Sequence, residues 1–148
     1  MNQHSIEKLN ELLKGEHMAM QVYEKTKNLQ RDKQVQEMID KFAQDHKRHI
    51  DLLSQRIKEL GGKPEHKAGL SSLMVDVTAM INSLQGPEHL LIQLYDGEDK
   101  GIHAYEDRID ELDPVSQYVV KGIMAEDHEH LKYFKARMEE EKKERQKH

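Results

Sequence analysis

Apolar residues recur at alternating spacings of three and four along four long segments of this 148-residue chain. In the first segment the repeat includes Ile6, Leu9, Leu13, Met20 and Tyr23, with one polar interruption. Such spacing places a single apolar stripe on one face of an α-helix, as in helices that bury a seam against their neighbours. The four stripes therefore favour an all-α bundle.

Capping signals set the limits of the expected helices. Asp32 is the expected N-cap of the second helix, and Gly61-Gly62 provides its C-terminal stop signal. Pro87 and Pro114 suit the first turns of the helices that they begin. We predict helices over about residues 3–29, 32–60, 70–84, 87–112 and 114–145.

The lengths of the connections predict the topology. Short connections join the first long helix to the second and the third long helix to the fourth, so each pair is antiparallel. The connection between the two pairs is long enough to cross the bundle, and it contains the short helix over 70–84. We expect one domain, residues 1–148, with four long antiparallel helices and one long crossover.

Composition excludes several classes of function. A net charge of −5 argues against nucleic-acid binding by bulk electrostatics. The absence of cysteine excludes disulfides, iron–sulfur clusters and thiol chemistry. No apolar run reaches membrane length, and the first residues, MNQHSIEKLN, show no signal-peptide pattern. We expect a cytoplasmic protein with no membrane or nucleic-acid partner.

The first and third long helices are related by an internal repeat. Adding 82 to positions 16 and 23 converts Glu16 and Tyr23 into Glu98 and Tyr105. Each glutamate interrupts an apolar stripe, and each tyrosine follows it by seven residues. We interpret the tyrosines as core residues first, with a hydrogen bond to a ligand or a redox role as further options, since each lies two turns from the glutamate of its own helix.

The second and fourth long helices repeat in the same way. Adding 81 converts His46 and His49 into Asp127 and His130. A shift of 82 would instead set His49 against Leu131. The shift of 81 is preferred because it matches every polar interruption to another, so the chain reads as two copies of one helical hairpin.

Polar residues interrupt the four stripes near the middle of each helix. The set is Glu16, His46, His49, Glu98, Asp127 and His130. Antiparallel helices meet at their middles, so these side chains should converge in one core layer. Buried carboxylates need neutralisation, and the stripes supply no lysine or arginine. Oxygen and imidazole ligands suit iron, manganese or zinc, so we predict a metal site.

Simpler interpretations exist for each residue taken alone. A single glutamate in a stripe is usually an edge residue that extends to solvent, and a single histidine is usually a hydrogen-bonded core residue. The matched set across two hairpins favours metal ligation. Asp45 lies beside the layer and could hydrogen-bond a ligand or be solvated. Whether His46 or Asp45 supplies the ligand from the second helix stays open.

Several segments resemble the ferritin-like superfamily. Glu16 with Tyr23 resembles the first-helix motif of ferritins, bacterioferritins and rubrerythrins. The second and fourth helices of rubrerythrins resemble KFAQDHKRHIDLL and MAEDHEHLKYF. A bacterial ferritin-like family designated only as a domain of unknown function is similar to KELGGKPEHKAGL and LYDGEDKGIHAYEDRIDELDP. The resemblance implies a ferritin-like four-helix bundle with two iron or manganese ions that react with oxygen or peroxide, or a role in iron handling.

The sequence departs from the ligand pattern of this superfamily. The usual Glu-x-x-His appears as His46-x-x-His49 and as Asp127-x-x-His130, so three carboxylates remain where four would balance two divalent ions. The alternative is a non-catalytic bundle with a structural or zinc site, or no metal, in a stress or interaction role. Hemerythrin-like oxygen binding fits less well, because the stripes lack its histidine spacing. The resemblance also implies a homodimer or larger homo-oligomer.

Overall fold

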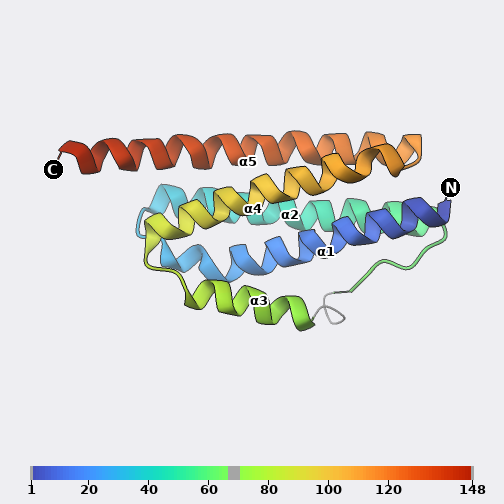
Figure 1. The fold of residues 1–148 in the computed structure, drawn as a ribbon, viewed down its shortest axis with the longest axis horizontal. Helices are drawn as coiled ribbons and strands as arrows, with labels where there is room; N and C mark the ends of the chain where they lie inside the picture. The colour runs from blue at the N-terminus through green and yellow to red at the C-terminus, as the bar shows by residue number, and fades with distance from the viewer. Residues whose placement is uncertain (1, 67–70, 148) are drawn as a thin grey trace.

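Four long helices lie side by side, and a short helix covers one of their faces (Figure 1). The computed structural model describes residues 2–66 and 71–147. The elements are α1 (Asn2–Thr26), η1 (Lys27–Leu29), α2 (Lys33–Glu59), α3 (Ser71–Asn82), α4 (Pro87–Arg108), η3 (Ile109–Glu111) and α5 (Pro114–Lys147). No strand occurs among the described residues, and the predicted all-α class is confirmed.

The helices are arranged as two antiparallel hairpins. Helix α1 packs against α2 and α4 against α5, and contacts of α1 with α4 and of α2 with α5 join the pairs. Because α2 and α4 run in the same direction, the chain between them spans the length of the bundle and carries α3 along α1 (Figure 1). The predicted crossover bundle is confirmed. Residues 67–69 of the predicted loop and residue 70 of the predicted short helix lie outside the described residues.

The structure places some helix ends differently from the prediction. The first predicted helix, 3–29, consists of α1 followed by η1, and the predicted helix 87–112 consists of α4 followed by η3. Tight 3-10 turns of this kind are frequent at the ends of α-helices. Helix α5 continues to Lys147, where Arg145 in the last turn pairs with Glu88 of α4. In the described part of the chain, no helix is both long and apolar enough to span a membrane.

The N-terminal signals act as predicted. The Asp32 carboxylate accepts hydrogen bonds from the backbone N–H groups of Gln34 (2.8 Å) and Val35 (3.3 Å), which satisfies two donors at the start of α2. At the start of α4, Gly86 has a φ of 118° and Pro87 occupies the first turn. A positive φ of this size is strained for any residue with a side chain, so glycine permits the sharp entry into α4.

The C-terminus of α2 depends on its two glycines. Gly61 has a φ of 88°, and its N–H donates to the Lys58 carbonyl at 2.9 Å. The Gly62 N–H donates to the Ile57 carbonyl at 2.9 Å, which completes a Schellman motif. A Cβ at Gly62 would lie 2.6 Å from Ile6 Cγ2 of α1. These glycines therefore end the helix and let the chain pass closely over α1.

Two apolar clusters fill the bundle on either side of its middle. One contains Leu9, Leu12, Leu13, Leu53, Ile57, Tyr105, Leu112, Val120 and Ile123. The other contains Tyr23, Val35, Ile39, Phe42, Ala43, Leu90, Leu91, Leu94 and Phe134. Each fully buried large side chain contributes about 1.5–3 kcal/mol to folding. Because the duplicated hairpins are antiparallel, the equivalent residues Leu9 and Leu91 lie in opposite clusters, and the polar layer lies between them.

Asp113 joins the start of α5 to α2. Its carboxylate accepts hydrogen bonds from the Ser116 backbone N–H (3.1 Å) and from Arg56 Nη2 (2.8 Å). Burial raises the pKa of Asp113, but its bonds with Ser116, Arg56 and Ser5 outweigh that effect and bring the pKa to about 2. This carboxylate is therefore ionised and fully partnered at neutral pH.

Asp113→Ala is expected to lower the free energy of unfolding by about 1–3 kcal/mol at pH 7, since it removes a cap and the partner of Arg56. The stabilisation from Asp113 is present above its unfolded pKa, near ~3.9, and is lost as pH falls through about 2. Urea unfolding at pH 7 and pH 3 measures both effects. The matched control is Asp51→Ala on the exposed face of α2. Equal stabilities of the two variants at pH 7 would contradict the prediction.

Candidate metal centre

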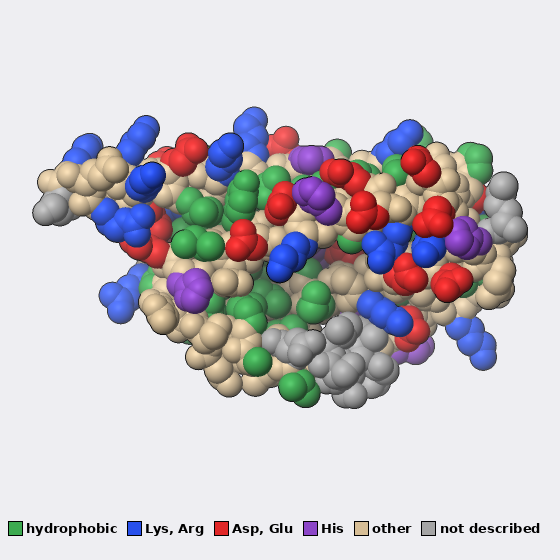
Figure 2. Space-filling view, viewed as in Figure 1, with side chains coloured by type: hydrophobic (Ala, Val, Ile, Leu, Met, Phe, Trp, Pro, Cys, Tyr) green, Lys and Arg blue, Asp and Glu red, His purple; other side chains and the backbone are tan. Residues whose placement is uncertain are grey.

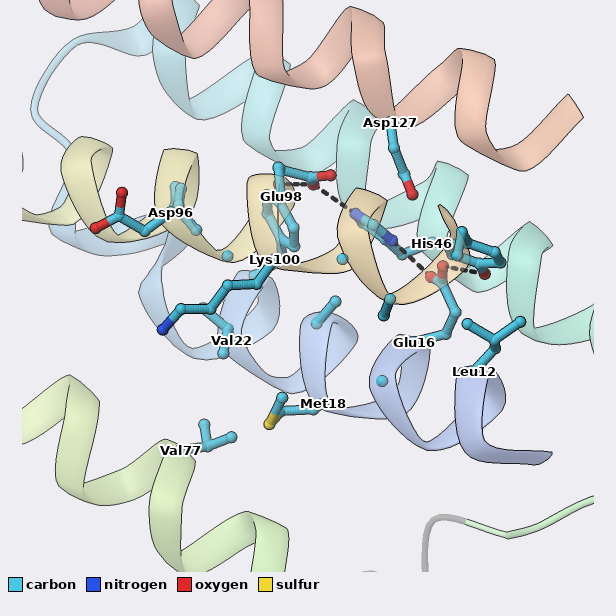
Figure 3. A pocket seen from close by; sticks show the side chains of 18 of the residues that line it. Leu12, Glu16, Met18, Val22, His46, Val77, Asp96, Glu98, Lys100 and Asp127 are labelled. Atoms are coloured by element: carbon cyan, nitrogen blue, oxygen red, sulfur yellow. Dashed lines mark hydrogen bonds and ion pairs between the residues drawn. The ribbon is translucent and has the colours of Figure 1, made fainter. Parts of the chain in front are cut away.

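All six polar residues predicted from the stripes meet in one layer between the apolar clusters. None is more than 5% exposed. They come from four helices: Glu16 from α1, His46 and His49 from α2, Glu98 from α4, and Asp127 and His130 from α5. Figure 3 shows Glu16, Glu98, His46 and Asp127 pointing toward one another.

His46 lies between the two glutamates. Its Nδ1 is 2.7 Å from Glu16 Oε2, and its Nε2 is 2.7 Å from Glu98 Oε1. Ionised carboxylates only accept hydrogen bonds, so both ring nitrogens carry protons and the ring is an imidazolium. Burial lowers the pKa of His46, but the charges of Glu16 and Glu98 outweigh it and raise this pKa well above its usual value. Without metal, His46 therefore acts as an internal cation.

The two glutamates are ionised in response. Burial alone would raise the pKa of Glu16, but the charge and hydrogen bond of His46 bring it to about 2. The pKa of Glu98 is also lowered, because the charge of His46 and the hydrogen bond from His130 outweigh the effect of burial. The two carboxylate charges thus face the His46 imidazolium, and His130 Nδ1 lies 3.1 Å from Glu98 Oε1.

His49 and His130 are each held from outside the layer by a carboxylate. His49 Nε2 donates to Glu126 Oε1 at 2.6 Å, and His130 Nε2 donates to Asp45 Oδ2 at 2.8 Å. Arg48 Nη2 contacts both acids, at 2.7 Å from Glu126 Oε1 and 3.2 Å from Asp45 Oδ1. Because Nε2 donates outward, Nδ1 of each ring faces the centre. Carboxylates that fix the histidine tautomer in this way are typical of metal sites.

Two atoms of the layer have no hydrogen-bond partner among the described residues. They are His49 Nδ1 and Asp127 Oδ1, which lie 3.8 Å apart. Burial and the charges of Glu98 and Glu16 raise the pKa of Asp127 to about 9, so its carboxyl is protonated at neutral pH. Unsatisfied buried polar atoms are rare and costly, and a cation between these two would satisfy both.

The ligand atoms form two overlapping sets, and within each set all atoms lie within 4.8 Å of one another. One set contains Glu16, His46, His49 and Asp127, and the other contains His46, Glu98, Asp127 and His130. The shared members are His46 and Asp127, which the shift of 81 also pairs in sequence. The oxygen and imidazole donors fit iron, manganese or zinc.

The tyrosines contact the glutamates of the opposite hairpin. Tyr23 Oη donates to Glu98 Oε1 at 2.5 Å, and Tyr105 Oη donates to Glu16 Oε1 at 2.9 Å. A hydrogen bond to a ligand was one option from the sequence, and each tyrosine makes one, but not to the glutamate of its own helix, because seven residues span about 10 Å along a helix. Antiparallel packing of α1 on α4 brings the other glutamate within reach instead. Burial and the carboxylate charges raise both tyrosine pKa values well above 10.0, so the hydroxyls remain donors.

Glu126 was not among the residues predicted from sequence. It is exposed on one side and lies off the apolar stripe, so periodicity does not select it. The repeat does contain a signal, since adding 81 to Asp45 gives Glu126. The two acids contact the histidines of opposite hairpins, as the tyrosines contact opposite glutamates. The sequence left open whether His46 or Asp45 supplies the ligand from α2. The structure places His46 in the layer and Asp45 outside it, against His130.

A protein-family comparison bears on this arrangement. The model described as Domain of unknown function (DUF2383) matches residues 4–111. The chain belongs to this family. The matched segment of this DUF2383 protein runs from α1 to η3 and contains four of the six residues, whereas Asp127 and His130 lie on α5 beyond it.

Comparison with solved structures supports the fold of this DUF2383 protein. The chain is similar to a crystal structure of ferritin-like, diiron-carboxylate proteins from Bacillus anthracis strain Ames, with a TM-score of 0.71 and 20% sequence identity. The similarity covers 93% of this chain and 96% of the other. The ferritin-like fold predicted from sequence is confirmed. Comparison with curated proteins found no match.

Proposed function

We propose that this DUF2383 protein binds two divalent metal ions, iron foremost, in the polar layer of its bundle. The observation that carries the proposal is the pair of unpartnered atoms His49 Nδ1 and Asp127 Oδ1 within two overlapping ligand sets. Glu16 and His49 would hold one ion, and Glu98 and His130 the other. Asp127 belongs to both sets and completes both.

The surrounding residues would position the ligands. Glu126 and Asp45 hold the histidines with Nδ1 turned inward, and Tyr23 and Tyr105 fix one oxygen of each glutamate. The two apolar clusters enclose the layer from either end of the bundle. When bound, iron supplies redox chemistry toward oxygen or peroxide.

His46 makes the two metal positions unequal. A neutral imidazole offers a single lone pair once one nitrogen keeps its proton, so His46 can ligate only one ion at a time. It must also lose a proton before it ligates, because both of its nitrogens are protonated between Glu16 and Glu98. The ion without His46 would have one protein ligand fewer, and such an open position is where a small substrate binds.

A second candidate function rests on the same histidine. The His46 imidazolium already compensates one carboxylate charge without metal. A bundle that binds no metal, or a single structural ion such as zinc, would serve as a non-catalytic stress or interaction protein. The experiment that follows separates the two functions.

Metal analysis of protein purified without chelator, followed by anaerobic addition of ferrous iron and then oxygen, tests the proposal. We expect two irons per chain and an absorbance change on oxidation. His49→Ala should reduce the iron content, whereas the matched control His103→Ala, on the exposed face of α4, should not. Stoichiometric zinc with no iron oxidation, or no bound metal with an unchanged thermal midpoint, would overturn the proposal in favour of the second function.

Glu126→Gln is expected to weaken metal binding by about 10–100-fold, the usual effect of removing a carboxylate that orients a histidine ligand. Its effect on metal-free stability should be small, about 1 kcal/mol or less, since its ion pair with Arg48 is solvent-exposed. Competition against a chelator of known affinity measures the change. Glu129→Gln, on the exposed face of the same helix, is the control. Equal affinities for both variants would show that Glu126 does not orient His49.

A further inference from the structure

An open pocket of about 360 Å³ lies between α1, α4 and α3 and ends at the polar layer. Its inner end is formed by Glu16, Glu98 and Asp127. Figure 3 shows these acids on one side of the pocket, with Val77 of α3 opposite. The pocket therefore connects the surface of the bundle to four of the predicted ligands, these three acids and His46.

The walls of this pocket are mostly apolar. Leu12, Val22 and Leu94 line it from α1 and α4, and Val77 and Met80 cover it from α3. Figure 2 shows apolar side chains gathered between α4 and α3, whereas charged side chains lie over α4 and α5. Glu11, Asp96 and Lys100 also line the pocket, so charged side chains border its apolar wall.

Glycines of α1 and α4 border the pocket. Gly15, Gly97 and Gly101 line the pocket, and a Cβ added to any of them would meet nothing within 4 Å. Glycine destabilises a helix interior relative to alanine, and no close contact requires it here. These glycines keep volume open beside the layer instead of serving helix packing.

The polar end of the pocket includes the unpartnered carboxyl of the candidate metal centre. Asp127 lines the pocket, is 2% exposed, and its Oδ1 has no hydrogen-bond partner among the described residues. The volume lies within the range of about 300–1,000 Å³ that small-molecule sites occupy, and it exceeds the cavity of about 150 Å³ that holds benzene. Size, apolar walls and a polar end together describe a site for an organic molecule.

We propose that this pocket binds a small apolar organic molecule with one end against Glu16, Glu98 and Asp127. The inference deepens the proposed function and rests on it, because it makes this molecule the organic substrate of the metal centre. The walls from α1, α4 and α3 select an apolar body, and the polar layer receives the group that is to react.

Fluorescence titration of the full chain with N-phenyl-1-naphthylamine, an apolar probe with a naphthyl and a phenyl group, tests the pocket. We expect saturable binding to the metal-free wild type. Gly101→Leu should weaken it by about tenfold or more, because the new side chain fills the space. Gly122→Leu is the matched control, since Gly122 is an exposed helical glycine outside the pocket with nothing within 4 Å of an added Cβ. Gly97→Leu replaces Gly101→Leu if circular dichroism shows that the latter does not fold.

Proton relaxation of the same probe tests its position. With Mn²⁺ in the centre, the probe protons should relax faster than with Zn²⁺, and Gly101→Leu should abolish the difference. Equal probe binding by the wild type, Gly101→Leu and Gly122→Leu overturns the inference, whatever the metal content. Probe binding that is lost only in Gly101→Leu supports the pocket, even when metal analysis finds no ions. The absence of ions would then overturn the proposed function and leave the pocket standing.

Discussion

His46→Leu is expected to lower the free energy of unfolding of the metal-free protein by about 3–5 kcal/mol, the usual cost of removing one partner from a buried ion pair. The imidazolium contacts Glu16 and Glu98 at 2.7 Å each, and all three side chains are buried. Leucine would leave the two buried carboxylates without the imidazolium that contacts both of them. Urea unfolding in the presence of chelator measures the change.

Divalent metal should reverse part of this loss, because bound ions would neutralise the same two glutamates. The matched control is His103→Leu, which removes an exposed histidine of α4 and should change stability little. If His46→Leu is as stable as the wild type in chelator, His46 does not act as an internal cation. Metal could also stabilise the wild type and His46→Leu by the same small amount, no more than it stabilises an unrelated protein. That outcome would show that the centre does not bind the metal.

Asp127→Asn is expected to separate metal binding from stability. Asp127 belongs to both ligand sets, and an amide provides no anionic oxygen. We expect the metal affinity to fall by more than about 100-fold, since even the loss of a residue that only orients a ligand costs about 10–100-fold. The metal-free variant should be at least as stable as the wild type, because the pKa of Asp127, near 9, already keeps its carboxyl neutral.

The pH dependence of the metal-free protein gives this prediction a second test. Between the unfolded pKa of aspartate, about 3.9, and the folded pKa of Asp127, about 9, the folded chain holds the extra proton. Stability should therefore fall as pH rises through this window, and the raised pKa of His46 adds to the fall above about pH 6.5. Asp127→Asn should show a shallower fall, and Asp51→Asn the same fall as the wild type.

Metal affinity should change in the opposite direction. His46 and Asp127 must both release protons before they can ligate, so chelator competition should show tighter binding as pH rises toward 9. An Asp127→Asn variant that keeps the metal affinity of the wild type, or a wild-type stability that rises between pH 5 and pH 9, would contradict this account of the layer.

The duplication explains how one chain builds a nearly symmetric centre. Asp45 and Glu126 are equivalent in the repeat, and each contacts the histidine of the opposite hairpin. The tyrosines cross between hairpins in the same manner. The exception to the symmetry is the pairing of His46 with Asp127, where one copy supplies a cation and the other a neutral acid. This difference is what distinguishes the layer from one with four carboxylates.

The amino-acid sequence by itself determined the class of fold and the membership of the polar layer. Apolar spacing identifies the buried face of each helix, because a helix of about 3.6 residues per turn must turn its stripe inward. Polar residues at matched positions in the middle of all four stripes indicate a shared core layer, so Glu16, Glu98 and the four other members of the layer could be predicted. The helix caps at Asp32 and Gly61 could also be predicted, because capping depends on the backbone of the neighbouring residues in the chain.

Only the tertiary structure decided which of these residues touch. Tyr23 reaches Glu98 and Glu126 reaches His49 because antiparallel helices bring them together, and spacing along one helix carries no information on distances between helices. The imidazolium state of His46 follows from the two carboxylates that face it across the bundle. The pocket arises in the same way, since Gly15 and Gly101 create usable space only where α1, α4 and α3 pack around them.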